Sequence, residues 1–447
     1  MTALSPLPGR RSLWDHALAP FVRFSHVQSS GGLVLVASAV LALLWANSPY
    51  ASQYTALWGL PVGVHLGNAA LRMSLGHWIN DGLMAVFFFM VGLEIKREIL
   101  VGELNSLRQA LLPIVAAIGG MLVPAALYLL LNHATPGRSG WGIPMATDIA
   151  FALGILALLG SRVPPGLKVF LAAVAIVDDI GAVLLIAIFY SSSIEVVWLA
   201  AAGGIFLVML LLNAAGARHP LIYTACGLGL WAAFLGSGVH ATVAGVLAAM
   251  AVPARPRIAS QDFTDWARHS LERFEEASDG DIRVSPEKWA ALDGMNRARL
   301  LATTPLQRIE HALHPYVAYG IMPLFALANA GVRLSGDAGA AFTEPVSLGI
   351  LLGLFGGKKS GVFLACWAMF GLRLATPPAG TRPLQFYGVS CLAGIGFTMS
   401  IFMSGLAFPG IPDFENQAKL AILMASTLAG VCGYVVLRLS TPPPAIA

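Results

Sequence analysis

Charged residues are scarce in this sequence of 447 residues: only 11% are Asp, Glu, Lys or Arg, whereas 57% are hydrophobic. Ordinary soluble domains are about 25% charged. The composition therefore excludes a water-soluble protein and indicates a chain that lies largely in a membrane. Cysteine is scarce too. The four cysteines lie in apolar stretches without CxxC spacing, which excludes a zinc site and a disulfide framework.

Long hydrophobic runs take up most of the chain. Twelve segments are suited to cross the ~30 Å hydrocarbon core as helices, although the two that flank 236–238 have only ~15 apolar residues each. The segments lie at about 31–47, 77–99, 110–131, 142–160, 169–190, 196–212, 220–235, 238–253, 313–332, 346–370, 385–407 and 417–437. The sequence therefore predicts an all-α polytopic membrane protein with about 12 transmembrane helices.

Lysines and arginines predict the orientation. With both termini in the cytoplasm, 21 of the 27 fall in inner regions, and the outer regions carry only Arg72, Arg138, Arg333 and Lys419. This satisfies the positive-inside rule. Merging the segments at 236–238 would place a loop with nine cations outside, so twelve segments are kept. Cations precede the first run, as in a signal peptide, but no small-residue cleavage site follows, so we expect an uncleaved span.

The predicted organisation follows from these segments. Residues 1–30 and 438–447 are cytoplasmic tails, 31–253 carry helices one to eight, 254–312 form a charged cytoplasmic loop, and 313–437 carry helices nine to twelve. Rough alternation of apolar and polar residues around Gly59 and Pro61 is compatible with a small external β-hairpin at about 50–70.

Two adjacent carboxylates, Asp178 and Asp179, interrupt the apolar run 169–190. As a helix, this run would cross the membrane and place the pair near its midplane. An ionised Asp there costs about 2.5 to 3.5 kcal/mol. The pair must therefore be stabilised or used. A buried structural pair neutralised by its neighbours is the alternative to an ion-binding site.

Other unusual residues share this depth: Thr147 and Asp148 in segment four, Lys358 in segment ten, Gly394, Gly396 and Thr398 in segment eleven, and His240 at the start of segment eight. Glycine and polar residues at membrane depth indicate broken helices. Segments four and eleven are the middle members of two triplets, 110–190 and 346–437, which run with inverted topology. Interrupted segments at matching places in inverted repeats point to the substrate site of a secondary transporter.

Several motifs occur in a specific order: HWINDGLMAVFFFMVGLEIKRE, MATDIAFALGILALLG, AVAIVDDIGAVLLIAIFY, SGVHATVAGV, IEHALHPYVAYGIMPLFALANAGV and AGIGFTMSIFMSGLAF. From about His77 to Arg438 the chain resembles the NhaA-type sodium/proton antiporter family. It departs from the family pattern in two places. The residue after Lys358, a proline in the family, is Lys359, and the loop 254–308 is longer.

The resemblance implies roles for the residues at the midplane. Asp178 and Asp179 would bind Na+ or Li+ and H+, with Asp179 meeting the cation and Asp178 pairing with Lys358. Thr147 and Asp148 would form the unwound crossing of two broken helices. The resemblance also implies a pH-regulated, electrogenic antiporter of the bacterial inner membrane that works by alternating access, contacts membrane lipids and dimerises through the external hairpin. We expect no enzymatic activity, no cofactor and no nucleic-acid partner.

A second set of polar residues lies at the predicted cytoplasmic side. Glu94, Lys96, Arg97 and Glu98 end segment two, and Glu310, His311 and His314 begin segment nine. The resemblance to the antiporter family implies that this cluster senses pH, and His240 is a further candidate for a pH-sensing residue. Solvated charges at helix ends are the simpler explanation for the cluster, and a satisfied histidine near the external end is the simpler explanation for His240.

The chemistry of exchange can be stated without the family. Sodium is a hard cation that binds oxygen ligands, and carboxylates bind it only when deprotonated, so H+ and Na+ compete for the same oxygens. For protons to compete near neutral pH, a carboxylic acid with an ordinary pKa of about 4 must reach about 7, which corresponds to ~4 kcal/mol.

Other functions remain open at this point. A sodium-coupled carrier of organic anions would need cationic or polar groups around its cavity, whereas carboxylates dominate here. A metal-dependent membrane enzyme such as a prenyl transferase would need a second Asp-rich motif, which the chain lacks. A passive cation channel would move Na+ without moving H+. For Asp148 a helix cap, and for Lys358 a structural partner of the helix breaks, are the simpler roles.

Overall fold

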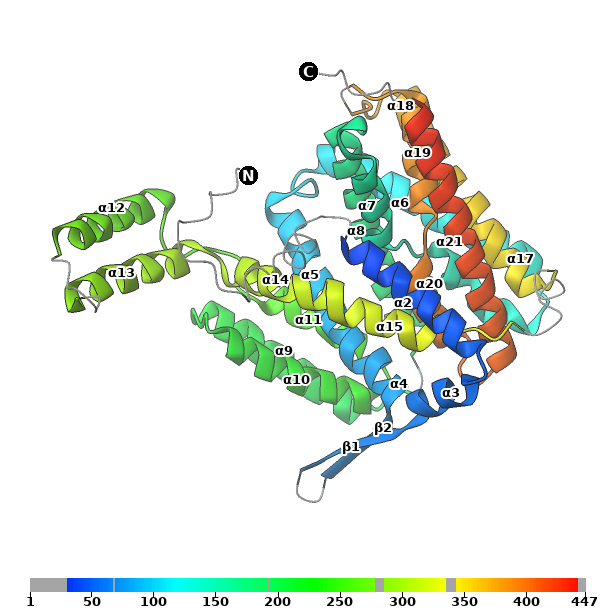
Figure 1. The fold of residues 1–447 in the computed structure, drawn as a ribbon, viewed down its shortest axis with the longest axis horizontal. Helices are drawn as coiled ribbons and strands as arrows, with labels where there is room; N and C mark the ends of the chain where they lie inside the picture. The colour runs from blue at the N-terminus through cyan, green and yellow to red at the C-terminus, as the bar shows by residue number, and fades with distance from the viewer. Residues whose placement is uncertain are drawn as a thin grey trace.

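A computed structural model shows a bundle of long helices with one small β-hairpin (Figure 1). It describes residues 30–66, 69–191, 193–277, 285–334, 343–378 and 380–440. Most of each predicted cytoplasmic tail lies outside these residues. The first part of the chain forms α2 (Ser30–Ala46), α3 (Ala51–Gly59), β1 (Pro61–Leu66), β2 (Ala69–Ser74), α4 (Leu75–His77), α5 (Met84–Val101), α6 (Leu107–Asn132), α7 (Ile149–Leu158), α8 (Pro165–Phe189), α9 (Val196–Ala214), α10 (Pro220–Ser237) and α11 (Thr242–Ala251).

The second part is also helical. It forms α12 (Ser260–Glu276), α13 (Pro286–Ala302), α14 (Pro305–Tyr316), α15 (Met322–Asn329), α17 (Pro345–Leu351), α18 (Lys359–Gly371), α19 (Pro383–Ala393), α20 (Phe397–Ala407) and α21 (Pro412–Ser440). Short 3-10 helices add Pro136–Met145 and Gly160–Arg162.

Six helices of the described residues are long and apolar enough to cross a membrane, or up to nine if each bent pair counts as one span. The three bent pairs are α2 with α3, Pro136–Met145 with α7, and α19 with α20. The remaining predicted segments, 77–99, 238–253 and 313–332, are helical but fail this test for visible reasons. The first carries four charges near its end, α11 is short, and the third includes polar residues such as His314 and Asn329. The polytopic helical fold is thus confirmed.

Three π-helical turns interrupt these helices, at Trp78–Leu83, Val317–Ile321 and Leu352–Lys358. Such turns are rare and frequently occur at functional sites because they widen the helix locally and redirect side chains. Asp81 lies in the first turn and Lys358 ends the third. Lys358 is therefore placed by an irregularity that a regular helical pattern would not reveal.

Glycine and alanine at helix contacts let neighbouring helices approach closely. A Cβ atom on Gly119 of α6 would lie 2.6 Å from the carbonyl oxygen of Gly361 on α18. On α5, a Cβ atom on Gly92 would lie 2.7 Å from Cβ of Ala249 on α11. Small residues at such contacts favour tight packing of membrane helices. The first contact holds the helix that carries Lys358 against α6.

The predicted small β-hairpin is present. β1 pairs antiparallel with β2, and Pro61 lies opposite Ser74. The residues just before it, which we assigned to the same region of about 50–70, form α3 instead. Trp78 donates from its indole N–H to the carbonyl oxygen of Val62 (3.0 Å), which ties the hairpin to the bundle.

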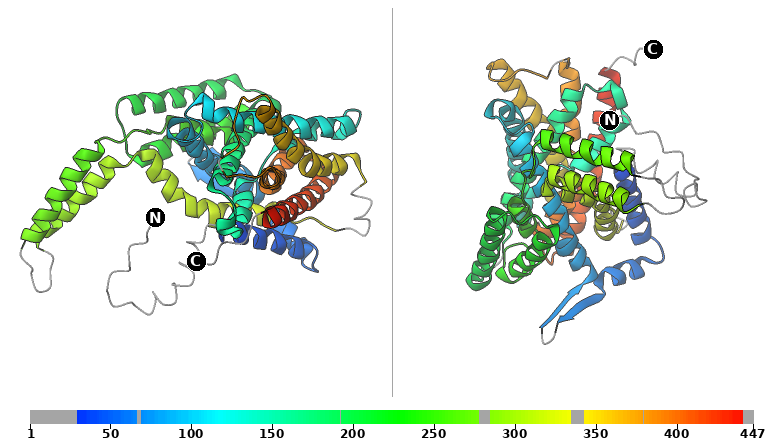
Figure 2. Two further views of the ribbon diagram at one scale, coloured as in Figure 1. Left: turned by 90° about the horizontal axis from the view of Figure 1, so that it is seen from above. Right: turned by 90° about the vertical axis from the view of Figure 1, so that its left-hand side faces the viewer.

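The charged region 254–312 contains two helices, α12 and α13. They pack side by side and project from the bundle (Figures 1 and 2). α14 then begins at Pro305, inside the region assigned to the loop, with Thr304 accepting from the N–H of Gln307 as its N-cap. Proline at the first helical position and a threonine cap explain this start.

Candidate ion-binding site

Two helix breaks meet in the centre of the bundle. The chain is extended at 146–148 between Pro136–Met145 and α7, and it leaves the helix at 394–396 between α19 and α20. The N–H of Asp148 donates to the carbonyl oxygen of Ile395 (2.6 Å), and the hydroxyl oxygen of Thr147 lies 2.9 Å from the carbonyl oxygen of Ala393. The breaks therefore satisfy each other's backbone groups, as membrane depth requires.

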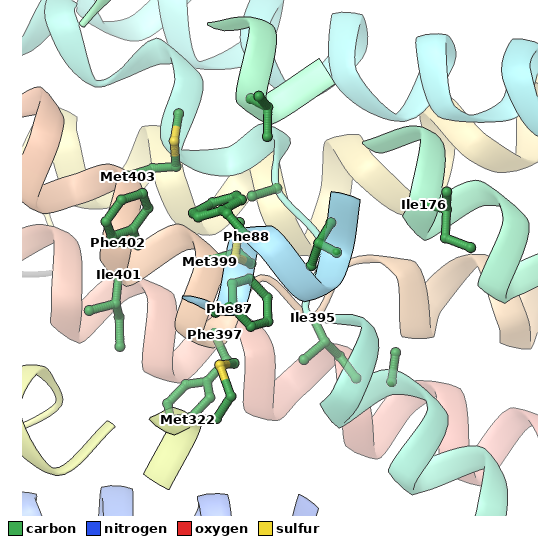
Figure 3. Packing of buried hydrophobic residues seen from close by; sticks show 14 of the residues in the cluster. Phe87, Phe88, Ile176, Met322, Ile395, Phe397, Met399, Ile401, Phe402 and Met403 are labelled. Atoms are coloured by element: carbon green, nitrogen blue, oxygen red, sulfur yellow. The ribbon is translucent and has the colours of Figure 1, made fainter. Parts of the chain in front are cut away.

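Glycine makes this crossing sterically feasible. A Cβ atom on Gly394 would lie 2.7 Å from the carbonyl oxygen of Leu354, and one on Gly396 would lie 3.0 Å from that of Ala146. A side chain at either position would therefore press on neighbouring backbone atoms. Around the crossing, Phe88, Met399, Phe402 and Met403 fill the space with apolar side chains (Figure 3). The centroids of the Phe88 and Phe402 rings lie 5.6 Å apart.

Asp148 is fully engaged at the crossing. Its Oδ1 accepts from the N–H of Phe151 (3.0 Å), so it caps α7. Its Oδ2 accepts from the N–H of Thr398 (3.1 Å) and from the Thr398 hydroxyl. The carboxylate therefore faces the N-terminal ends of both α7 and α20, where the helix dipole favours negative charge. This geometry supports the helix-cap role. It also assigns a partner, Thr398, that the sequence had indicated only as a helix-weakening residue.

Asp178 on α8 is held by two groups through one oxygen. Its Oδ2 lies 2.9 Å from Nζ of Lys358 and accepts from the Thr147 hydroxyl (2.6 Å). Lys358 also donates to the carbonyl oxygen of Met145. The side chains of Asp178 and Lys358 are both completely buried. The other carboxylate oxygen, Oδ1, is buried and has no hydrogen-bond partner among the described residues.

Asp179 is also buried, with 3% of its surface exposed. It points about 100° around the helix from its neighbour. Within the described part of the chain, its carboxylate accepts no hydrogen bond, so its oxygens are free to bind a proton or a cation. The charges of Asp178, Glu94 and Asp148 repel its negative charge, and Lys358 attracts it. The structure thus brings together Asp178, Asp179, Thr147, Asp148 and Lys358, the residues to which the resemblance gives roles at the crossing.

Lys359 does not join this group. Its Nζ lies 4.0 Å from the centroid of the Phe355 ring, in a cation–π contact. Of the two adjacent lysines, Lys358 is therefore the one that contacts an aspartate within the described part of the chain.

The predicted cytoplasmic cluster is partly assembled. Arg97 on α5 lies 3.6 Å from Glu94 and 3.2 Å from Glu98, and it forms an ion pair with Glu310 of α14. The cluster therefore centres on an arginine that joins two helices. His311 and His314, also predicted members, are exposed and have no ion pair among the described residues.

His240 lies in a different place. Its Nε2 is 3.5 Å from Oδ1 of Asp81, and its Nδ1 is 2.8 Å from the Thr242 hydroxyl. His77 approaches the same carboxylate. Sequence analysis did not single out Asp81 or His77 for this site. The spacing of four residues between them, in HWIND, was the available signal, because residues i and i+4 share one face of a helix.

Comparison with known proteins agrees with this site. The model of the family described as Na+/H+ antiporter 1 matches residues 22–437. A Na(+)/H(+) antiporter NhaA of Oleidesulfovibrio alaskensis is 55% identical over 426 residues, which cover 95% of this chain and 94% of the relative. One from Koribacter versatilis is 49% identical, covering 94% and 91% of the two chains, and Na(+)/H(+) antiporter NhaA 2 of Sorangium cellulosum is 49% identical, covering 98% and 93%. The chain belongs to the Na+/H+ antiporter 1 family of multi-pass membrane transporters.

Proposed function

We propose that this chain is an electrogenic antiporter that exports Na+ or Li+ from the bacterial cell in exchange for H+. The observation that carries this proposal is the state of the aspartate pair. Asp178 and Asp179 are buried at the crossing of two broken helices, and three of their four carboxylate oxygens have no hydrogen-bond partner among the described residues. Oxygen ligands of this kind suit a hard monovalent cation.

The exchange cycle follows from competition at these oxygens. When both carboxylates are ionised, Na+ binds at Asp179 and at the free oxygen of Asp178. When protons bind, Na+ leaves, because a protonated carboxyl group is a poor cation ligand. The empty site carries buried, uncompensated charge, which is costly to move through the membrane interior. The site therefore changes its accessible side only when Na+ or H+ is bound. This condition couples the outward movement of Na+ to the inward movement of H+.

Lys358 supplies the second proton-linked step. Its ammonium neutralises Asp178 in the ion-free site, and binding of Na+ competes with this pair. Because Asp179 and the Asp178–Lys358 pair both exchange protons, more than one H+ moves for each Na+. Net charge then crosses the membrane in each cycle, so the exchange responds to membrane voltage.

Two alternative functions lose support. A sodium-coupled carrier of organic anions would need cationic groups facing the crossing, but Lys358 is paired with Asp178, and Lys359 contacts Phe355. A metal-dependent enzyme would need a cluster of metal ligands, and the described residues contain no group of three or more His, Cys, Asp or Glu suited to a metal ion.

We further propose that both termini are cytoplasmic, that the β1–β2 hairpin is external and joins two copies of the chain, and that lipids surround the bundle in the bacterial inner membrane. The distribution of lysine and arginine supports this orientation. In the same orientation Arg97, Glu94, Glu98 and Glu310 lie on the cytoplasmic side, where we infer that this cluster adjusts the exchange rate to internal pH. His311 and His314 border this cluster.

Inverted membrane vesicles test the proposed exchange. Respiration acidifies their lumen, and addition of Na+ or Li+, but not K+, should dissipate the pH gradient across about pH 6.5 to 8.5 only when the protein is present. Clamping the membrane voltage at zero with K+ and valinomycin should change the rate if the exchange is electrogenic. Movement of Na+ without H+ would instead indicate a channel.

A further inference from the structure

A separate cluster of titratable side chains lies where the β-hairpin meets the bundle. His77 Nε2 lies 2.9 Å from Oδ2 of Asp81, and His240 Nε2 lies 3.5 Å from Oδ1 of the same residue. Both oxygens of one carboxylate therefore face an imidazole. One imidazole comes from the preceding turn of helix, and the other comes from the start of α11, more than 150 residues later in the chain.

Exposure decreases from the surface inward along this cluster. The side chain of His77 is 58% exposed, whereas those of Asp81 and His240 are 14% and 13% exposed. The ring of His240 packs edge-on against Phe402 of α20, with 5.5 Å between the ring centroids. The cluster thus extends from solvent to the helix that leaves the central crossing.

Several contacts fix the three side chains in place. The indole N–H of Trp231 donates to the carbonyl oxygen of Asp81 (3.1 Å), and Thr242 contacts the second nitrogen of His240 (2.8 Å). Neutral groups near them include Phe402 of α20 and the hydrogen-bonded pair of Asn80 and Asn329. Among the described residues, no lysine or arginine forms an ion pair with Asp81. Within the described residues, the two histidines are therefore the cationic groups placed to neutralise it.

We propose that His77, Asp81 and His240 form the external proton-loading site of the exchanger. This inference rests on the proposed function and orientation, which place the hairpin end of the bundle outside. His77 takes a proton from water and gives one from Nε2 to Oδ2 of Asp81. The carboxyl group then turns about its Cβ–Cγ bond, so that the protonated oxygen faces His240, and gives the same proton to Nε2. Each transfer breaks one N–H or O–H bond and forms another, so the protons balance and no co-reactant is needed.

The site holds an incoming proton beside α20 before the central carboxylates accept it. It should therefore determine how acidic the outside must be for exchange to run, and leave the response to internal pH unchanged. This separates it from the Arg97 cluster, which lies at the opposite end of α5.

Sodium efflux from right-side-out vesicles tests the proposal. The lumen is loaded with Na+ at about pH 8.5 and the external pH is varied from about 6 to 8.5, the range in which histidine titrates. The parent should show a midpoint at which external protons support half-maximal efflux. His77→Gln and Asp81→Asn should each move this midpoint to lower external pH by about half a pH unit or more, a roughly threefold weaker loading. The internal-pH profile, measured in inverted vesicles, should stay at the parent's value.

His133→Gln is the matched control, because His133 is an exposed histidine at the same end of the bundle whose ring contacts only the carbonyl oxygen of Leu130 among the described residues. Its midpoint should equal the parent's. If Asp81→Asn fails to insert, His77→Gln decides, since that side chain is largely exposed. Parent-like midpoints in His77→Gln, or an equal shift in the control, would overturn the proposal. Absence of sodium-driven proton movement in the parent would instead reject the proposed function itself.

Discussion

Replacement of Lys358 by alanine gives the sharpest test of the central ion pair. The ammonium lies 2.9 Å from Oδ2 of Asp178, and both side chains are fully buried. Removing one partner of a buried pair leaves an uncompensated charge and costs about 3 to 5 kcal/mol. The lost hydrogen bond from Lys358 to the carbonyl oxygen of Met145 adds about 1 kcal/mol.

The size of this loss should depend on pH. At low pH Asp178 of the variant takes up a proton and escapes most of the penalty. As the pH rises, Asp178 of the variant must either hold its proton against a lower proton concentration or stay buried as an unpaired carboxylate. Both cost free energy, so the variant should lose most stability in alkaline solution. Because Na+ binds only after Asp178 releases its proton, the exchange profile of Lys358→Ala should also move to more alkaline pH.

Lys359→Ala provides a matched control from the adjacent position. It removes the same side chain but only a cation–π contact with Phe355, worth about 0.5 to 2 kcal/mol. The assay is thermal unfolding of the purified variants at about pH 6 and pH 9, together with exchange in inverted vesicles. Equal stability and equal pH profiles for the two variants would refute the pairing of Lys358 with Asp178. A larger defect in Lys359→Ala would show that Lys359, and not Lys358, is the partner of Asp178.

Three further outcomes are expected. Thr147→Val removes the hydroxyl that donates to Asp178 and should cost about 1 to 3 kcal/mol of stability in thermal unfolding, whereas Thr147→Ser should retain most of it; equal losses would reject the hydrogen bond. Gly396→Ala should destabilise the crossing and slow exchange because a Cβ atom would lie 3.0 Å from the backbone carbonyl oxygen of Ala146, whereas Gly405→Ala on α20, with no atom within 4 Å, should be tolerated; similar effects would contradict the crossing geometry. Glu310→Gln should shift the exchange profile at saturating Na+, and parent-like profiles in both Glu310→Gln and His314→Ala would leave the aspartate pair as the only pH sensor.

The local sequence pattern predicts the helical segments and the position of the polar residues within them. Asp178 and Asp179 stand out because charge is costly in an apolar run, and Gly394 and Gly396 indicate a break because glycine weakens a helix. These signals depend only on neighbouring residues. They lead directly to the crossing observed between 146–148 and 394–396.

Contacts between distant segments could not be predicted in this way. Asp148 meets Thr398 across 250 residues, and Arg97 joins Glu94 to Glu310 across more than 200 residues. Such contacts arise from how the helices pack, which the spacing of residues along one helix does not determine. The π-helical turns are missed for a related reason: each adds a residue to a turn without changing the apolar character of the segment.

Competition between Na+ and H+ at the aspartate pair can be measured most directly as proton release. The purified protein is placed in weakly buffered solution near pH 8, and Na+ is added while the pH is recorded. The parent should release protons as Na+ displaces them, and Asp179→Asn, which keeps the shape of the side chain but removes its exchangeable proton, should release few or none. Proton release by Asp179→Asn equal to that of the parent would contradict the assignment of the shared site to this carboxylate.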